Sequence, residues 1–166
     1  VGDIIYPAGE TQSYDPRYFQ PYAAMIRHLP IFAILGNHDA GNATSFFDAW
    51  HLPTNPLDGT ERYYSFDFGY IHFVGLDTTK PLTAAILGWL ASDLDASPQR
   101  WKMVFFHHTM YSCGSYHGSS TSLINALAPV FEAHGVDVVY YGHDHHFERS
   151  FPIRAGTPLQ TTLDPN

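Results

Sequence analysis

Short apolar runs alternate along this chain with stretches in which apolar residues recur at helical spacing. The runs that predict buried strands, or the end of one, cover residues 1–5, 31–35, 101–106 and 136–141. Residues 62–68 and 70–77 alternate apolar and polar positions around Gly69, which is typical of an antiparallel hairpin. Residues 147–153 are expected to add a further strand.

The stretches with helical periodicity lie between these runs. They cover residues 15–29, which begin with Asp15 and Pro16 as a helix start signal, and residues 44–50, 82–94 and 121–134. Strands that alternate with helices favour right-handed crossovers and a mostly parallel sheet, to which the hairpin adds antiparallel pairing. No repeat or linker divides the chain, so we expect one layered α/β domain with mixed sheets over residues 1–166.

Composition narrows the classes of protein that this chain can be. Its 166 residues are 45% hydrophobic and 14% charged, which excludes intrinsic disorder. No apolar run approaches the ~20 residues that span a bilayer. The net charge of −8 argues against nucleic-acid binding, and the 11 histidines outnumber the 8 lysines and arginines, which favours metal binding. Because Cys113 is the single cysteine, it excludes an intramolecular disulfide and a cysteine-based zinc site.

Polar side chains follow four of the apolar runs at the point where each run ends. They are Asp3, the run Asn37-His38-Asp39, the pair His107-His108 and the run His143-Asp144-His145. In open α/β sheets the ligand site lies beyond the carboxyl ends of the strands, so these side chains are expected to converge there. Glycines at positions 2, 36 and 142 allow sharp turns at these points.

Each of these segments also has an ordinary structural explanation. Asp3 could be a helix N-cap, residues 36–39 could form a polar turn, and a His-x-His run could be one buried and one exposed histidine. The four segments together favour a binding site over coincidence.

The four segments resemble a known enzyme family. They are Gly-Asp-x-x-Tyr at 2–6, Gly-Asn-His-Asp at 36–39, Val-x-x-His at 104–107 and Gly-His-x-His at 142–145. This set is similar to the calcineurin-like metallophosphoesterases, and Tyr6 resembles the tyrosine of the purple acid phosphatases among them. The resemblance covers nearly the whole chain and implies a layered α/β/β/α sandwich with mixed sheets, which would here lack its first strand.

The resemblance implies a binuclear metal centre in which Asp3 bridges two ions. The second ion would take Asp3, Asn37, His107 and His143, a donor set that suits Zn, Mn or Fe(II). The first ion would take Asp3, Tyr6 and His145. A phenol with an ordinary pKa of about 10 ligates as phenolate, which favours Fe(III) at that position. The alternative for Tyr6 is simple packing at the end of a strand.

The same resemblance implies three residues that act near the substrate. His38 would donate to the bound phosphate, and Asp39 would orient His38 by accepting its other ring N–H. His117, in the Gly/Ser-rich stretch 112–122, would protonate the leaving alkoxide or bind the phosphate at mildly acidic pH. The alternatives are a histidine that merely orders its loop for His38 and a solvent-exposed loop histidine for His117. For His108, we expect supporting or packing contacts.

One motif of the family is missing from its expected place. The family's Asp-x-Gly at the end of its first strand would precede Val1, and the triplets at 39–41 and 67–69 stand elsewhere. We therefore expect the chain to be a segment cut from a longer protein at both ends. Because the first ion then has only three protein ligands, it should bind more weakly than the second.

The leading functional hypothesis is hydrolysis of small phosphate monoesters by metal-activated hydroxide, as in an acid phosphatase, in an exported (secreted or periplasmic) protein. A phosphodiesterase or nucleotidase of the same superfamily is one alternative. A non-catalytic phosphate-binding remnant is another, and the missing motif is its main support. Structural zinc is disfavoured because Asn, Asp and Tyr are not ligands of closed zinc sites.

Overall fold

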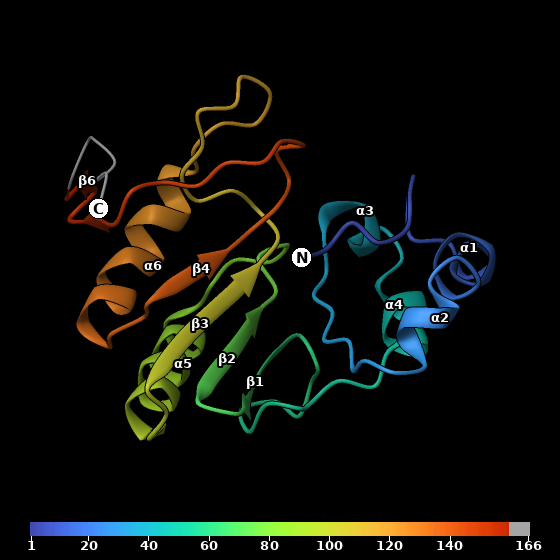
Figure 1. The fold of residues 1–166 in the computed structure, drawn as a ribbon, viewed down its shortest axis with the longest axis horizontal. Helices are drawn as coiled ribbons and strands as arrows, with labels where there is room; N and C mark the ends of the chain where they lie inside the picture. The colour runs from blue at the N-terminus through green and yellow to red at the C-terminus, as the bar shows by residue number, and fades with distance from the viewer. Residues whose placement is uncertain (160–166) are drawn as a thin grey trace.

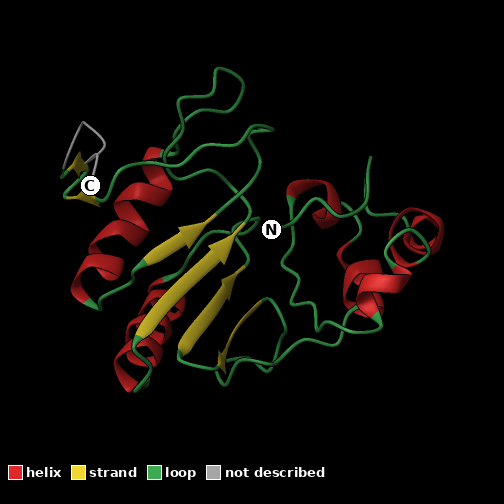
Figure 2. Ribbon diagram, viewed as in Figure 1, coloured by secondary structure: helices red, strands yellow, loops and turns green. Residues whose placement is uncertain are grey.

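A four-stranded mixed sheet lies at the centre of the computed structural model, which describes residues 1–159 (Figures 1 and 2). The sheet has the order β1-β2-β3-β4, with β1 at Tyr63–Phe68, β2 at Ile71–Leu76, β3 at Trp101–Phe106 and β4 at Val138–Tyr140. The β1–β2 pair is antiparallel, and β2–β3 and β3–β4 are parallel. The predicted hairpin is confirmed, and so are the strands predicted at 101–106 and within 136–141.

Two long helices, α5 (Ala84–Ala96) and α6 (Thr121–Ala133), cover one face of this sheet (Figure 1). Each begins at a hydroxyl side chain, Thr83 for α5 and Ser120 for α6, which accepts a backbone N–H of the first turn. Alternate residues of β2 and β3 point toward the helices, since side chains alternate between the faces of a strand. They form a buried cluster that includes Val74, Leu76, Val104, Phe106, Leu90 and Leu127.

The N-terminal third of the chain packs against the other face of the sheet, where Tyr64 joins its core. It contains short helical pieces: α1 (Thr11–Tyr14), a π-helical turn η1 (Asp15–Phe19), α2 (Ala23–Ile26), α3 (Asn37–Ala40) and α4 (Ala43–Ala49). The single helix predicted over residues 15–29 is wrong. Pro21 interrupts it, because proline lacks a backbone N–H and its ring clashes with the carbonyl four residues earlier.

Residues 1–5 and 31–35 do not form the predicted strands, and no strand pairs with either of them within residues 1–159. Their apolar character was correctly linked to burial, since Ile5, Ile34 and Leu35 are at most 1% exposed. A strand also needs a hydrogen-bonded neighbour, which local periodicity does not report. The strand predicted at 147–153 is also wrong. Only Ile153 enters a strand, the two-residue β5 (Ile153–Arg154), which pairs with β6 (Thr157–Pro158).

The extent of the predicted domain stays a prediction, and its residues 160–166 lie outside the described part of the chain. Among the helices of residues 1–159, none combines the length and apolar character that a membrane span requires.

A single buried carboxylate attaches the N-terminal segment to α3. Asp39 is completely buried, and its two oxygens accept the backbone N–H groups of Ile4, Ile5 and Gly36 at 3.0–3.1 Å. Three N–H donors and a carboxylate satisfy one another without solvent. These bonds fix residues 3–5 beside residues 36–39 although no strand pairing joins the two segments within the described chain.

A buried histidine ties α5 to the hairpin. The two ring nitrogens of His72 lie 2.7 Å from Asp67 Oδ1 and 2.9 Å from Asp93 Oδ2. Burial lowers the pKa of His72, but the hydrogen bonds to Asp93 and Asp67 outweigh burial and raise the pKa above its ordinary value. The protonated ring can then donate to both carboxylates.

Asp39→Asn should lower the free energy of unfolding by about 2 kcal/mol, because the amide NH₂ cannot accept and leaves a buried backbone N–H unpaired. Urea denaturation at neutral pH measures the loss. Asp48→Asn, the same change at an exposed position on α4, should stay within about 0.5 kcal/mol of the parent chain. Equal stability of the two variants would contradict the role given to Asp39.

His72→Gln should change how stability depends on pH. The raised pKa of His72 makes its contribution fully present below the unfolded value of about 6.5 and lost as pH rises through the higher folded value. The stability difference between the parent chain and the variant should therefore shrink with increasing pH, as urea denaturation at several pH values would show. His28→Gln, at an exposed histidine, serves as the control. A difference that does not vary with pH would argue against the charged pair.

Candidate metal centre

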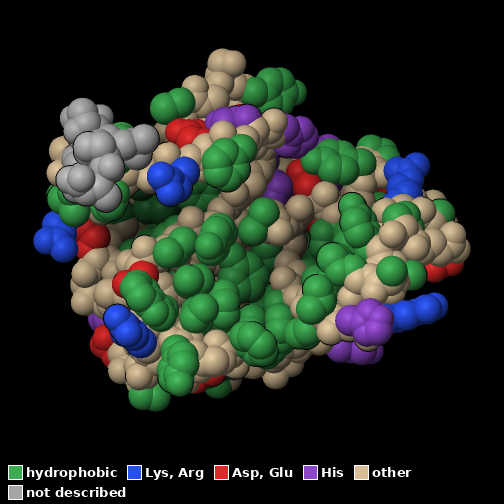
Figure 3. All heavy atoms as spheres, in the orientation of Figure 1, with side chains coloured by type: hydrophobic (Ala, Val, Ile, Leu, Met, Phe, Trp, Pro, Cys, Tyr) green, Lys and Arg blue, Asp and Glu red, His purple; other side chains and the backbone are tan. Residues whose placement is uncertain are grey.

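The polar residues that follow the four apolar runs converge at one edge of the sheet. His107 directly follows β3, and His143 lies three residues after β4. Asp3 lies in the N-terminal segment, and Asn37 begins α3. Figure 1 shows the N-terminal segment and α3 beside the carboxyl end of β3, and Figure 3 shows histidine side chains gathered near this junction.

The ring of His107 lies at the middle of this arrangement. Its Nε2 is 2.9 Å from Asn37 Oδ1, 3.1 Å from His143 Nδ1 and 3.2 Å from Asp3 Oδ2. Ligand atoms about 2.0–2.1 Å from one ion lie roughly 2.8–3.4 Å apart at octahedral or tetrahedral angles. The observed spacing therefore fits donors that surround a common ion.

The protonation of these donors supports the same conclusion. His107 Nδ1 lies 2.9 Å from the Val1 carbonyl oxygen, which can only accept, so Nδ1 carries a proton and Nε2 is the ring nitrogen left to face Asn37, His143 and Asp3. Burial, together with the neighbouring His108, His117 and His107, lowers the pKa of His143 to about 4. When Nε2 of His107 gives up its proton as well, four lone pairs can face one another, an arrangement that a cation stabilises and a single proton cannot satisfy at all four.

Asp3 lies between two groups of donors. Its Oδ1 accepts the backbone N–H of His38 at 2.9 Å, and its Oδ2 faces both His107 Nε2 and the Tyr6 hydroxyl, the latter at 3.1 Å. Burial alone would raise the pKa of Asp3, but hydrogen bonds with His107, the His38 amide and Tyr6 lower it to about 2. The carboxylate is charged at any physiological pH, which suits a ligand that two ions share.

Tyr6 and His145 lie on the more open side of Asp3. The Tyr6 hydroxyl is 3.2 Å from His145 Nε2, and both side chains are exposed. Burial and the charge of Asp3 raise the pKa of Tyr6 to about 12, so the phenol remains protonated unless a strongly polarising cation is present. Asp3, Tyr6 and His145 thus form a second set of three donors.

The backbone is strained at two of these positions. Asp3 has φ = 52° and His143 has φ = 69°, a left-handed region that residues other than glycine adopt rarely. Such strain is typical of functional sites, where surrounding contacts hold the unfavourable conformation. Gly36 is needed for a related reason: a Cβ there would lie 2.1 Å from the Asp3 backbone nitrogen. The convergence of these donors therefore requires unfavourable backbone conformations at Asp3 and His143 and a glycine at position 36.

The predicted partnership of His38 and Asp39 is wrong. His38 Nδ1 lies 2.6 Å from the Pro7 carbonyl oxygen, and the His38 ring packs on Tyr6 with ring centres 4.2 Å apart. Asp39 instead accepts the three backbone N–H groups described above. Adjacent residues on a helix such as α3 project about 100° apart, so their side chains do not face each other. His38 Nε2 remains the ring nitrogen available to a ligand.

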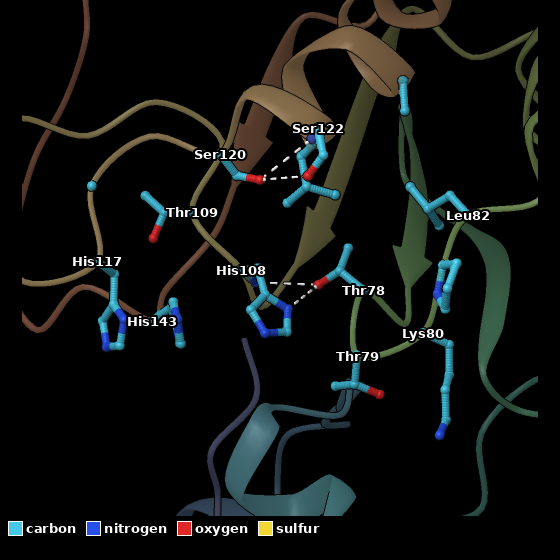
Figure 4. A pocket seen from close by; sticks show the side chains of 14 residues that line it. Thr78, Thr79, Lys80, Leu82, His108, Thr109, His117, Ser120, Ser122 and His143 are labelled. Atoms are coloured by element: carbon cyan, nitrogen blue, oxygen red, sulfur yellow. Dashed lines mark hydrogen bonds between the residues drawn. The ribbon is translucent and has the colours of Figure 1, made fainter.

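His117 joins the site through ring stacking. Its ring centre lies 3.6 Å from that of His143 with the planes 28° apart, and Figure 4 shows the two rings side by side. His117 also borders a cavity of about 640 Å³ that extends from His143 toward Lys80 and Leu82. The loop histidine named from the sequence therefore lies beside His143, and its role stays a prediction.

His108 makes the supporting contacts expected of it, and the same cavity brings in Thr78 and Lys80, which the sequence motifs do not include. His108 lines the cavity next to His143, and its Nδ1 lies 2.9 Å from Thr78 Oγ1 (Figure 4). Thr78 and Lys80 follow β2, which runs parallel to β3 and so ends at the same sheet edge. The rule that ligand sites lie at the carboxyl ends of strands could have pointed to them.

Comparison with known proteins supports this interpretation of the geometry. A family model described as calcineurin-like phosphoesterase matches residues 1–147. Purple acid phosphatase 4 of Arabidopsis thaliana is 35% identical over an alignment 185 residues long, gaps included. The alignment covers 87% of this chain and 51% of that protein. Purple acid phosphatase 17 of the same plant is 27% identical over 175 residues, with coverage of 87% and 51%. The chain thus spans about half the length of these relatives.

A solved structure has the same fold. A purple acid phosphatase from yellow lupin (Lupinus luteus) seeds superposes with a TM-score of 0.76 at 20% identity, over 97% of this chain and 32% of the lupin chain. The likeness confirms the predicted α/β fold class. With four ligand-bearing segments at one sheet edge and a family model that matches most of its length, this chain belongs to the calcineurin-like phosphoesterases and is similar to the purple acid phosphatases among them.

Proposed function

We propose that the chain provides the catalytic centre for hydrolysis of small phosphate monoesters at a binuclear metal site. The observation that carries the proposal is the convergence of lone pairs from Asp3, Asn37, His107 and His143. Two ions at such a centre supply Lewis-acid activation of a phosphoryl oxygen and of a water molecule. Membership of the calcineurin-like phosphoesterases supports hydrolysis of a phosphoester. The preference for monoesters over diesters is our further proposal.

Each donor set suits a different ion. Asp3, Asn37, His107 and His143 would hold the second ion, which we propose is Zn, Mn or Fe(II) because these ions accept mixed nitrogen and oxygen donors. Asp3, Tyr6 and His145 would hold the first ion. Tyr6 favours Fe(III) there, since a phenol ligates as phenolate, which forms readily only beside a strongly polarising cation.

The remaining polar side chains would act on the substrate directly. His38 is fixed by Pro7 through Nδ1, so its Nε2 can donate to a phosphate oxygen when the ring is protonated. His117, exposed at the rim of the cavity, can give a proton to the leaving alkoxide when its ring is protonated. The cavity of about 640 Å³ beside His117 would receive the leaving group.

The net charge of the chain indicates which class of substrate it binds. A net charge of −8 favours a small phosphoester over a nucleic acid as the substrate. We also propose an exported location, secreted or periplasmic, which the acidic, lysine-poor composition and the similarity to purple acid phosphatases support.

Tyr6→Phe should remove the visible absorption of the Fe(III)-loaded chain while leaving one divalent ion tightly bound. The phenol oxygen belongs only to the three-donor set, and the four-donor set does not contain it. Calorimetric titration with Zn²⁺ should show one tight ion per chain in both proteins, because four donors bind better than three. Two tightly bound ions per chain, or a visible spectrum that the substitution leaves unchanged, would contradict this assignment.

Asn37→Ala and His143→Ala should each reduce hydrolysis of nitrophenyl phosphate by the metal-loaded chain by about 100-fold or more, since each removes a donor from the centre. His28→Ala, at an exposed histidine elsewhere, is the matched control. The parent chain should hydrolyse the monoester faster than bis(nitrophenyl) phosphate. Faster turnover of the diester would favour a phosphodiesterase, and metal binding without turnover of either ester would favour a phosphate-binding module.

A further inference from the structure

A buried carboxylate lies between the two histidines of the last motif and is hydrogen-bonded to a neighbouring loop. Asp144 is 8% exposed and directly follows His143. Its oxygens accept the Ser112 hydroxyl at 2.7 Å and the backbone N–H groups of His117 and Gly118, both at 3.1 Å. All three donors belong to the loop between β3 and α6, so Asp144 joins this loop to the segment that carries His143 and His145.

The loop fits closely around this carboxylate. A Cβ at Gly114 would lie 2.5 Å from Asp144 Oδ2, so no larger residue fits there without a shift. The Gly114 N–H donates to the Ser112 hydroxyl oxygen at 2.8 Å, and that hydroxyl donates to Asp144. Asp144 thus contacts the turn at residues 112–118 at Ser112, His117 and Gly118, from a distant part of the sequence.

The position of His117 depends on its hydrogen bond to the Asp144 carboxylate. Its side chain is exposed, and its ring stacks on His143 at 3.6 Å between ring centres. The backbone N–H of the same residue donates to Asp144. His143 and Asp144 are consecutive in the chain. The ring of His117 and its backbone N–H therefore contact the same short segment, in which His143 is a candidate metal donor.

A second carboxylate on this segment holds a different part of the loop. Glu148 accepts the Cys113 N–H at 3.0 and 3.1 Å, and its Oε2 lies 2.9 Å from His146 Nε2. It does not bond His117 or Gly118. Glu148 thus provides a natural comparison, since it secures the loop without fixing the residue that stacks on His143.

We propose that Asp144 is a positioning residue that sets the place of His117 as proton donor to the leaving group, a proposal that rests on the function proposed above. Asp144 acts through the backbone of His117 and does not touch the substrate. The carboxylate keeps the imidazole over His143, so a phosphoester bound at the centre has its leaving oxygen within reach of one defined donor. The placement of the loop and of the proposed metal donor His143 are in this way coupled through adjacent residues.

Asp144→Asn tests the proposal at constant size. Whichever way the carboxamide turns, its NH₂ replaces an oxygen that accepts a backbone N–H, so a donor faces a donor at His117 or at Gly118. Amide hydrogen exchange on the metal-free chain measures the loss of these hydrogen bonds directly. The amides of His117 and Gly118 should exchange about tenfold faster or more in Asp144→Asn, while Glu148→Gln should leave them near the parent rate. Unchanged protection in Asp144→Asn would overturn the structural part of the proposal.

The metal-loaded chain supplies the second readout through leaving-group dependence. An alkyl phosphate needs a proton on its leaving alkoxide, whereas nitrophenolate leaves as a stable anion. Asp144→Asn should therefore lower kcat for the alkyl ester about 10-fold to 100-fold more than for the nitrophenyl ester, and His117→Asn should show the same pattern. In the double variant the alkyl-ester rate should fall no further than in His117→Asn, because both changes remove one function.

The outcomes separate the two proposals. A parent chain that binds metal but hydrolyses neither ester contradicts the proposed function, while the exchange data still decide whether Asp144 fixes His117. A parent chain that hydrolyses both esters, with Asp144→Asn slowing them by equal factors, overturns the positioning role. Equal selectivity loss in Glu148→Gln would also overturn it, since the effect would then come from general loosening of the loop.

Discussion

The buried carboxylate of Asp39 is the constraint on which the metal centre depends. Asp3 and Asn37 come from two segments that no strand pairing joins within residues 1–159, and the three backbone N–H groups that Asp39 accepts hold these segments together. Buried N–H groups must find acceptors, and here one side chain supplies them all. The sheet positions His107 and His143, and Asp39 brings the other half of the donor set to them.

Bringing these donors together is unfavourable in itself. Asp3, Asn37, His107 and His143 direct lone pairs toward a common region, and Asp3 and His143 adopt left-handed backbone conformations to do so. Hydrogen bonds from outside the centre help to hold two of its members, His107 through the Val1 carbonyl and Asp3 through the His38 amide. Metal binding is then favoured by a donor set that is already in place.

Sequence alone predicted most of the centre because its residues follow apolar runs that end at one edge. The hairpin, α5 and α6 were predicted for similar reasons, since their periodicity is local. The errors concern features that are not local. Strand pairing for residues 1–5 and 31–35 depends on distant neighbours, and the Asp39 interaction joins residues 35 positions apart. Nothing in the pattern around Asp144 indicates that its carboxylate binds a loop some 30 residues earlier.

The contact between His107 and the Val1 carbonyl has a consequence for how this centre can diversify. The tautomer of His107 is dictated by a main-chain oxygen, which every amino acid possesses, so no replacement of the Val1 side chain alters it chemically. Natural variation or engineering that aims at a different ion must therefore change the donor side chains themselves. The orientation of His107 is insulated from substitution at Val1, although His107 itself is not.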